Sequence, residues 1–233
     1  MISVVMPAFN EADFLEAAVR EVTEGMAARG HEVEVLVVEN GSSDSTAALA
    51  QRLADELPEV RALSLPDPDY GAALRAGFLA AGGDLVANFD VDYYDLDFVE
   101  RCLGLLTDGG PVIVVGSKRA EGADDQRVWP RRLITSVFTI VLRRGFGLGV
   151  SDTHGMKVMR RQPLLAVVER CRFGTDLFDT ELVLRAERAG LGVAEVPVAV
   201  RESRPSRTPI LRRAVRTVRG LVRLRLALRH DPG

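Results

Sequence analysis

The chain has 233 residues, a formal net charge of −3, 47% hydrophobic residues and 27% charged residues. This composition is typical of a globular protein and excludes wholesale disorder. The charge is uneven, because residues 201–233 contain ten Arg and two acids, or +8, which leaves −11 for residues 1–200. Two Cys and three His exclude a disulfide framework and a Cys- or His-rich metal site. Any metal must then be held by carboxylates, which favours Mg²⁺, Mn²⁺ or Ca²⁺.

The amino-terminal segment predicts a strand rather than a signal peptide. Met1–Pro7 has no basic residues before its apolar run. The longest near-apolar run, Leu133–Leu142, has about half of the roughly 20 residues that a helix needs to cross a bilayer. We therefore expect a cytoplasmic protein without a membrane span.

Strand and helix patterns alternate along the first half of the chain. Strands are predicted at Ile2–Met6, Val33–Val38, Val60–Ser64, Leu85–Phe89 and Val112–Val115, and helices at Glu11–Ala28, Asp44–Leu57, Ala72–Ala81 and Leu96–Leu106. This alternation indicates an α/β fold with a Rossmann-like, mostly parallel sheet flanked by helices. Ligands of such sheets bind beyond the carboxyl ends of the strands, which points to residues 7–11, 39–44 and 90–94.

The alternation stops after Gly116. A helix is predicted at Arg131–Arg144, a short strand at Met156–Met159, a helix at Asp176–Ala189 and a strand at Val193–Val200. Ile210–Arg229 predicts a basic amphipathic helix, which suits an anionic membrane surface; the alternative is that its apolar face packs on the domain. It lacks the aromatic residues that would indicate a nucleic-acid partner.

Asp90-Val91-Asp92, directly after the fourth predicted strand, is the sharpest chemical signal. Alternate residues of an extended segment point to the same side, so both carboxylates can face one cation. Mg²⁺ and Mn²⁺ bind one or two carboxylates together with phosphate oxygens. Capping of the next helix is the competing explanation, but Asp95 and Asp97 already serve it. Neither a G-x-G-x-x-G fingerprint nor a P-loop follows the first strand.

Two further polar groups have open interpretations. Glu39–Thr46 contains a turn glycine and serines suited to capping, yet the Glu39 carboxylate can also accept hydrogen bonds from a base or ribose. The second group consists of side chains that could line an anion site or be solvated surface residues: Arg119, Arg131, Arg132, Arg201, Ser206 and Arg207.

Taken in order, these segments resemble the family 2 glycosyltransferases of GT-A fold, and among them the dolichyl- and polyprenyl-phosphate mannose or glucose synthases. The matching segments are Val4–Glu11, Val37–Thr46, Gly71–Gly77, Gly83-Asp84, Asp90–Asp92, Val115–Arg119, Asp152–Arg161, Phe178–Leu182, Glu195–Val198 and Arg201–Arg207. The resemblance predicts a GT-A domain over residues 1–208, followed by the basic tail of residues 209–233. The chain departs from the family at Glu39-Asn40, where the family has two aspartates, and at His154-Gly155-Met156, where it has Ser-Gly-Phe.

The resemblance implies a metal-dependent, inverting transfer of a hexose from a GDP- or UDP-sugar to a polyprenyl or dolichyl phosphate, at the inner face of the membrane. The implied donor-binding residues are Pro7, Ala8, Asn10, Glu11, Glu39, Asp44, Gly71, Asp90 and Val91, with Mg²⁺ or Mn²⁺ on Asp90 and Asp92. The acceptor phosphate would contact Arg119, Arg131, Arg201, Ser206 and Arg207.

The acceptor decides whether a general base is needed. A phosphate is already an anion and needs positioning alone, whereas a hydroxyl needs a base, for which Asp179 and Glu181 are candidates beside the metal-binding Asp92. The alternatives to a polyprenyl-phosphate enzyme are a soluble glycosyltransferase acting on a hydroxyl of a small molecule or glycan, and a non-catalytic nucleotide-sugar-binding protein.

Overall fold

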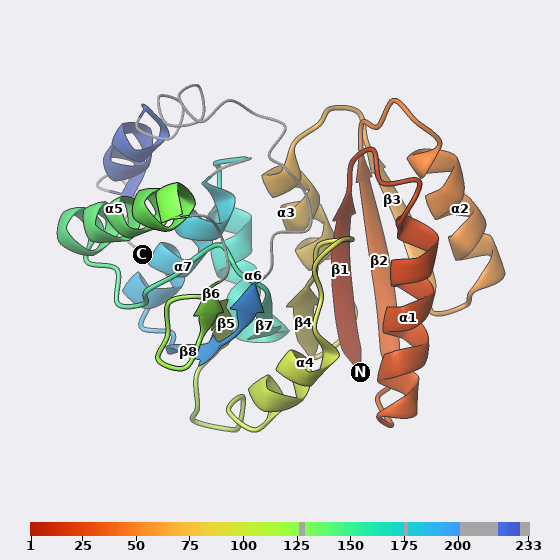
Figure 1. Cartoon of the computed structure of the whole chain (residues 1–233), viewed down its shortest axis with the longest axis horizontal. Helices are drawn as coiled ribbons and strands as arrows, with labels where there is room; N and C mark the ends of the chain where they lie inside the picture. The colour runs from red at the N-terminus through yellow and green to blue at the C-terminus, as the bar shows by residue number, and fades with distance from the viewer. Residues whose placement is uncertain (126–128, 175–176, 201–218, 229–233) are drawn as a thin grey trace.

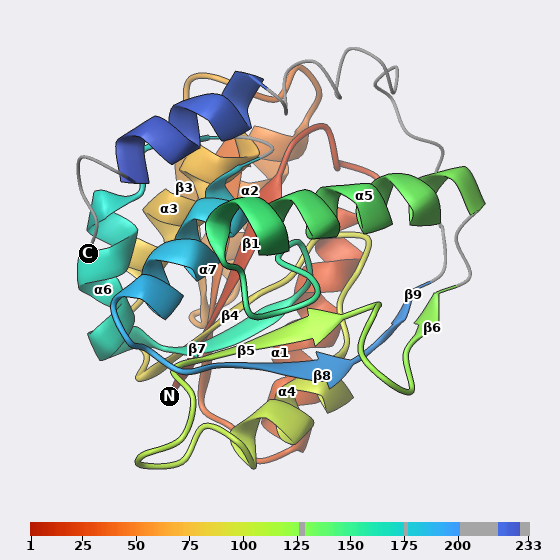
Figure 2. The same cartoon turned by 90° about the vertical axis from the view of Figure 1, so that its left-hand side faces the viewer.

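A computed structural model of the protein describes residues 1–125, 129–174, 177–200 and 219–228. Within these residues, a seven-stranded sheet has the order β3-β2-β1-β4-β7-β5-β8 and carries helices on both faces (Figures 1 and 2). Neighbouring strands are parallel, except where β7 pairs with β4 and β5. The predicted α/β fold with a mostly parallel sheet is confirmed.

The first half of the chain contains the alternating elements that the sequence predicts. They are β1 (Ile2–Ala8), α1 (Leu15–Ala28), β2 (Val33–Asn40), α2 (Thr46–Glu56), β3 (Val60–Leu65), α3 (Tyr70–Ala80), β4 (Leu85–Asn88), α4 (Leu96–Leu103) and β5 (Ile113–Ser117). The largest boundary difference is at α1, which begins at Leu15 rather than Glu11. The reason is local, because Asn10 adopts a positive φ of 54° and the chain turns before the helix begins.

The second half departs further from the prediction. Its elements are β6 (Asp124–Asp125), α5 (Trp129–Phe146), β7 (Lys157–Arg160), α6 (Arg161–Arg170), α7 (Phe178–Arg188), β8 (Val193–Pro197) and β9 (Ala199–Val200). The sequence does not predict α6, although Leu164, Val167 and Val168 form a buried helical face and Pro163 lies in the first turn, where proline is tolerated. The strand expected at Val193–Val200 divides into β8 and β9, and β9 pairs with β6.

Side-chain alternation along the central strands divides the core into two layers. On one face, Val4 and Met6 of β1 pack with buried residues of α1, α2 and α4. On the other face, Val5 packs with buried residues of α3, α6 and α7. The sheet is therefore covered on both sides, and its strand ends are the edges left for ligand-binding loops.

Residues 219–228 form a helix that packs on the domain. Leu221, Leu224 and Leu228 are buried in the same core layer as α6 and α7, whereas Val222 and Leu226 are 58% and 50% exposed. For this part of the basic tail, packing on the domain is what the structure shows. In the part of the chain that the structure describes, no helix combines the length and the apolar character needed to cross a membrane.

Candidate functional site

The loops that follow β1 and β2 interlock through small polar groups. The Asn10 backbone N–H donates to the Ser42 Oγ at 3.0 Å, and the Asn10 Oδ1 accepts from the Ser43 N–H at 2.8 Å. The Glu11 N–H donates to the Thr46 Oγ1 at 2.9 Å. The two loops therefore form one rigid unit at the carboxyl ends of β1 and β2.

Two carboxylates of the predicted donor site stabilise this unit. Asp44 accepts from the Thr46 hydroxyl at 2.5 Å and from its N–H at 2.9 Å, and these bonds lower the pKa of Asp44. Glu39 is buried; its Oε1 accepts from the Ser42 N–H at 2.5 Å and its Oε2 from the Ser64 hydroxyl at 2.8 Å. The structure thus brings Asn10, Glu11, Glu39 and Asp44 together, and Glu39 bonds to the turn through one oxygen and to β3 through the other.

The other predicted donor residues lie at the same edge of the sheet. Pro7 and Ala8 end β1 and are buried. Gly71 lies in the first turn of α3, where a Cβ would come within 2.5 Å of the Gly174 carbonyl carbon and 2.7 Å of the Phe178 Cβ. Gly71 therefore allows α3 to approach the segment before α7 closely, which brings the neighbouring Tyr70 to the strand ends.

Asp90-Val91-Asp92 forms a tight turn beyond β4. Asp90 and Tyr93 exchange two backbone hydrogen bonds of 3.1 Å, so Val91 and Asp92 occupy the corner. The Val91 side chain is buried and anchors the turn, whereas Asp92 is exposed. The Tyr70 hydroxyl donates to the Asp90 Oδ1 at 2.8 Å. The extended segment expected at residues 90–92 is therefore a tight turn, in which one carboxylate of the predicted metal pair is held in place and the other faces outward.

Burial raises the pKa of Asp90 to about 6, an effect to which the charges of Asp92 and Asp179 add and which Tyr70 and Lys157 oppose. Within the described residues, no group of three or more His, Cys, Asp or Glu side chains is arranged to hold a metal ion. A pair of carboxylates is nevertheless the donor set that Mg²⁺ or Mn²⁺ takes when phosphate oxygens and water complete its shell. Asp90 and Asp92 offer this donor set, and their binding of an ion that arrives with a nucleotide diphosphate stays a prediction.

Asp179, in the first turn of α7, belongs to the same group of side chains. Its Oδ1 accepts from the Lys157 Nζ at 2.6 Å, and both side chains are buried. The Lys157 Nζ also donates to the Gly155 carbonyl at 2.8 Å. The sequence analysis did not single out Lys157, although a lysine inside a short apolar strand is itself unusual.

Glu181, the second candidate for a general base, has a different environment. It is fully buried, its Oε2 accepts from the N–H groups of Arg172 and Phe173 at 2.8 Å each, and its Oε1 accepts from the Arg185 Nε at 2.8 Å. The geometry therefore suits a structural task for Glu181, which holds the segment before α7. Asp179 is the one of the two that lies beside the Asp90 turn.

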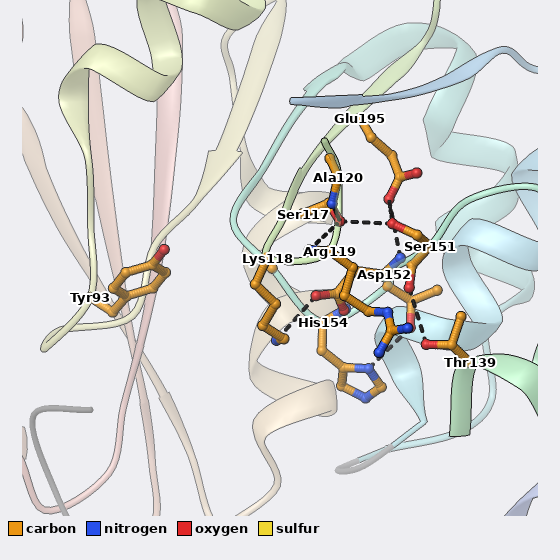
Figure 3. A network of polar contacts seen from close by, with 12 residues as sticks. Tyr93, Ser117, Lys118, Arg119, Ala120, Thr139, Ser151, Asp152, His154 and Glu195 are labelled. Carbon is orange, nitrogen blue, oxygen red and sulfur yellow. Dashed lines mark hydrogen bonds and ion pairs between the residues drawn. The ribbon is translucent and has the colours of Figure 1, made fainter. Parts of the chain in front are cut away.

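A second polar network lies beyond the carboxyl end of β5 (Figure 3). The Ser117 Oγ accepts from the N–H groups of Arg119 and Ala120 at 3.1 Å each, and lies 2.9 Å from the Ser151 Oγ. The Ser151 hydroxyl in turn donates to the Glu195 Oε1 at 2.7 Å. These bonds fix the chain at 117–120 against the loop that precedes β7.

The same network carries cationic side chains. The Lys118 Nζ lies 3.2 Å from the Asp152 Oδ2, and although burial raises the pKa of Asp152, Lys118 and the His154 N–H lower it below its usual value. The Arg119 Nη1 donates to the Ser136 Oγ of α5 at 2.7 Å. Figure 3 shows Lys118, Arg119 and His154 extending toward the same region. Lys118 is paired with Asp152 here, and an anion site at this place stays a prediction.

Of the predicted acceptor-phosphate residues, Arg119 lies in this network. Arg131 lies in α5, where the structure describes the helix backbone but not that side chain. Arg201, Ser206 and Arg207 lie outside the described residues. Their grouping into one phosphate site stays a prediction.

Comparison with known proteins places the chain among glycosyltransferases. The family model described as glycosyl transferase family 2 matches residues 3–167. The chain belongs to this family. The glycosyltransferase AglD of Haloferax volcanii is 32% identical over 205 residues, which cover 84% of this chain but 32% of that protein. An uncharacterized glycosyltransferase of Mycobacterium bovis is 35% identical over 201 residues, covering 85% of this chain and 84% of the relative.

Other similar proteins differ in what their names describe. A dolichyl-phosphate beta-glucosyltransferase of Trichomonas vaginalis is 29% identical over 222 residues, covering 88% of this chain and 65% of that protein. Among solved structures, the mannosyl-3-phosphoglycerate synthase of Rubrobacter xylanophilus has a TM-score of 0.73 at 21% identity, covering the whole of this chain and 75% of that one. The glucosyl-3-phosphoglycerate synthase of Mycobacterium tuberculosis, crystallised with Mn²⁺ and UDP-glucose, has a TM-score of 0.69 at 22% identity, covering 97% of this chain and 79% of that one. The likeness to these two structures confirms the fold.

Proposed function

We propose that this family 2 glycosyltransferase moves a hexose from a nucleotide-diphosphate sugar in a metal-dependent, inverting reaction. The observation that carries the proposal is the Asp90–Asp92 turn, held by Tyr70 beside the Lys157–Asp179 pair. The interlocked loops beyond β1 and β2 lie at the same edge of the sheet and suit the nucleoside. The carboxylates would therefore meet the diphosphate between the nucleoside loops and the acceptor side.

Asp90 and Asp92 would hold Mg²⁺ or Mn²⁺. When bound, such an ion offsets the negative charge that develops on the departing nucleoside diphosphate. The protein's own contribution is to orient the ligands, because the Tyr70 hydroxyl fixes Asp90 and the backbone bonds of the turn fix Asp92 relative to it. An oriented pair costs less reorganisation when the donor binds.

For the acceptor, we propose a polyprenyl phosphate. The name of the Trichomonas vaginalis relative supports this, because it gives dolichyl phosphate as the substrate class of that protein. The cationic side chains of the β5 network also support it, since a phosphate needs positive partners and desolvation rather than a base. Lys118, Arg119 and His154 are the described residues that would position it.

A lipid acceptor requires a surface that meets the membrane, and two helices offer one. α5 and residues 219–228 lie on the side that faces the viewer in Figure 2, and the Arg225 Nη1 donates to the Gly145 carbonyl at the end of α5 at 2.7 Å. Their outward faces mix aliphatic and basic side chains, as helices that bind anionic headgroups do. The exposed residues are Val137, Ile140, Val141, Arg143, Arg144, Arg219, Val222, Arg223 and Leu226.

A hydroxyl acceptor is the second candidate, and the position of the Asp179 carboxylate favours it. A carboxylate beside the proposed metal turn is placed where a general base would act. The two phosphoglycerate synthases of similar fold are named for reactions at a small molecule. In that reaction Asp179 would take the proton of the acceptor hydroxyl.

A donor screen tests both candidates. UDP- and GDP-sugars would be offered with Mn²⁺, with and without a short polyprenyl phosphate, and products identified by mass spectrometry. Transfer to the polyprenyl phosphate is the expected result. Transfer solely to a hydroxyl acceptor would replace the lipid proposal with the second candidate, and a protein that binds the donor but transfers to neither would be a non-catalytic binder.

Vesicle flotation tests the membrane surface separately. The protein is expected to float with vesicles that contain anionic lipid and to stay behind with zwitterionic vesicles. Replacement of the exposed Ile140 and Val141 by Ser should reduce flotation without loss of folding, because neither side chain is buried. Equal flotation of the wild type and this variant would reject α5 as the contact.

A further inference from the structure

Lys157 is fully buried next to the proposed metal turn. Its Nζ contacts the Asp179 Oδ1 at 2.6 Å and the Gly155 carbonyl at 2.8 Å, and the residue has no exposed surface. Lysine is rarely buried completely, because removing its charge from water is costly unless a partner compensates it. A buried ion pair is often no more stable than a well-packed apolar pair, so stability alone gives little reason for it.

The reversed direction of β7 brings Lys157 to the site. β7 runs antiparallel between β4 and β5, so its first residue lies at the edge where those strands end. Lys157 is paired with Asn88, two residues before Asp90, and with Val115 of β5. A parallel strand in this position would begin at the opposite edge of the sheet.

Close backbone packing fixes the position further. A Cβ on Gly155 would come within 2.0 Å of the Gly116 carbonyl oxygen, so the backbone before β7 lies directly against β5. The Gly155 carbonyl accepts one Lys157 proton, and Asp179 accepts another from the start of α7. The ammonium group therefore links β7, the loop before it and α7.

The charge of Lys157 reaches more than one carboxylate. Burial raises the pKa of Asp90, the charges of Asp92 and Asp179 add to this, and the charge of Lys157 opposes it. Tyr70 donates to Asp90, and its pKa is raised by burial and by the charges of Asp90 and Asp179. Asp90, Asp179 and Lys157 thus form one group of interacting charges.

We propose that Lys157 is a positioning residue for sugar transfer: it fixes Asp179 relative to the Asp90–Asp92 turn and sets the net charge that a divalent ion meets there. This inference rests on the proposed metal-dependent transfer. Lys157 contacts Asp179 rather than substrate, so its effect passes through the carboxylate. In water-poor surroundings a single nearby charge changes cation affinity measurably.

The test is a charge cycle on Mn²⁺ binding, measured by electron paramagnetic resonance at pH 8 with UDP present. Lys157→Met removes a positive charge and should tighten Mn²⁺ binding roughly three- to tenfold, whereas Asp179→Asn removes a negative charge and should weaken it by a similar factor. The double variant K157M/D179N should return close to the wild-type affinity. An unchanged Mn²⁺ affinity in all three variants would overturn the proposal.

Turnover gives the second readout. Each single variant should lower kcat roughly 100-fold with less than about a threefold change in donor KM, and the double variant should lose no more than the worse single variant. If the kcat losses of the two single variants multiplied in the double variant, Lys157 and Asp179 would act independently, which would refute their coupling. Lys157→Arg keeps the charge and should retain Mn²⁺ affinity within about twofold, which also keeps the test open if Lys157→Met folds poorly.

Arg185→Met is the matched control, because it removes another buried cation whose partner lies on α7. It should lower the thermal midpoint and leave Mn²⁺ affinity unchanged. If this control changed Mn²⁺ affinity as Lys157→Met does, general destabilisation would explain the result of the cycle. A wild-type protein that neither binds Mn²⁺ nor transfers sugar would refute the proposed function itself. Failure of the cycle in an active, Mn²⁺-binding wild type refutes the role of Lys157 alone.

Discussion

The two sides of the site are held in different ways. On the β1–β2 side, backbone N–H groups bond to Ser42, Thr46 and Asn10 across two loops. On the β5–β7 side, ion pairs such as Lys157–Asp179 and Lys118–Asp152 connect the segments instead. The first arrangement is spread over many weak bonds, whereas the second depends on a few ion pairs whose disruption is costly.

This difference predicts how each side responds to change. Loss of one hydroxyl in the β1–β2 loops leaves the other bonds in place, so the loops should tolerate single substitutions. Loss of one member of a buried pair leaves a charge without compensation, and that cost is large. The β1–β2 side is thus expected to be robust, and the β5–β7 side sensitive to single residues.

The largest effect is expected where the two sides meet. Asp92→Ala should lower kcat/KM by about 10³-fold and abolish Mn²⁺ binding, because it removes one of the two proposed metal ligands of the turn. Steady-state kinetics and Mn²⁺ titration measure both quantities. Asp97→Asn, an exposed residue paired with Arg29, is the control and should retain activity.

A substitution in α7 tests the cost of breaking a buried ion pair. Glu181→Gln should lower the free energy of unfolding by about 3 kcal/mol, because it breaks a fully buried pair with Arg185. Urea denaturation followed by circular dichroism measures the loss. Glu16→Gln, which alters an exposed pair with Arg20, should leave the midpoint unchanged. If both variants lost the same stability, the buried ion pair would be no more important than the exposed one.

A substitution in the β1–β2 loops tests the distributed stabilisation. Asp44→Ala removes acceptors for the Thr46 and Ala12 N–H groups, and should raise the donor KM about fivefold with kcat nearly unchanged, since the loops bind the donor before and during the reaction alike. Initial rates at varied donor concentration give the two constants. A fall in kcat with constant KM would place Asp44 in the chemical step instead.

The smallest effect concerns acid sensitivity. Although burial raises the pKa of Glu34, its hydrogen bonds from Ser3, Gly82 and Arg61 lower it below 4.5. A carboxylate with a lowered folded pKa adds stability that is full above its unfolded value and is lost as the pH falls through its folded value. Glu34→Gln should therefore flatten the stability profile below about pH 4.5, measured by urea midpoints at several pH values. A profile parallel to that of the wild type would contradict this assignment.

The sequence indicates strands, helices and the Asp90–Asp92 turn because these depend on local patterns. Val4, Val5 and Met6 alternate between two core layers, as a doubly covered strand requires. The pairing of β7 between β4 and β5 is not local, since it joins residues 85–88 to residues 157–160. Lys157 and Tyr70 could not be assigned to the site for the same reason. α6 is different, because the spacing of Leu164, Val167 and Val168 was visible in the sequence.

The insertion of β7 also has a consequence for the order in which the protein is made. During synthesis, β1, β2 and β3 can pair as soon as residue 65 has left the ribosome, and β4 joins β1 by residue 88. β4 then remains an edge strand until residues 157–160 emerge and cover it. The nascent chain therefore completes the loops beyond β1 and β2 early, and the carboxylate turn that follows β4 gains its second neighbouring strand some 70 residues later.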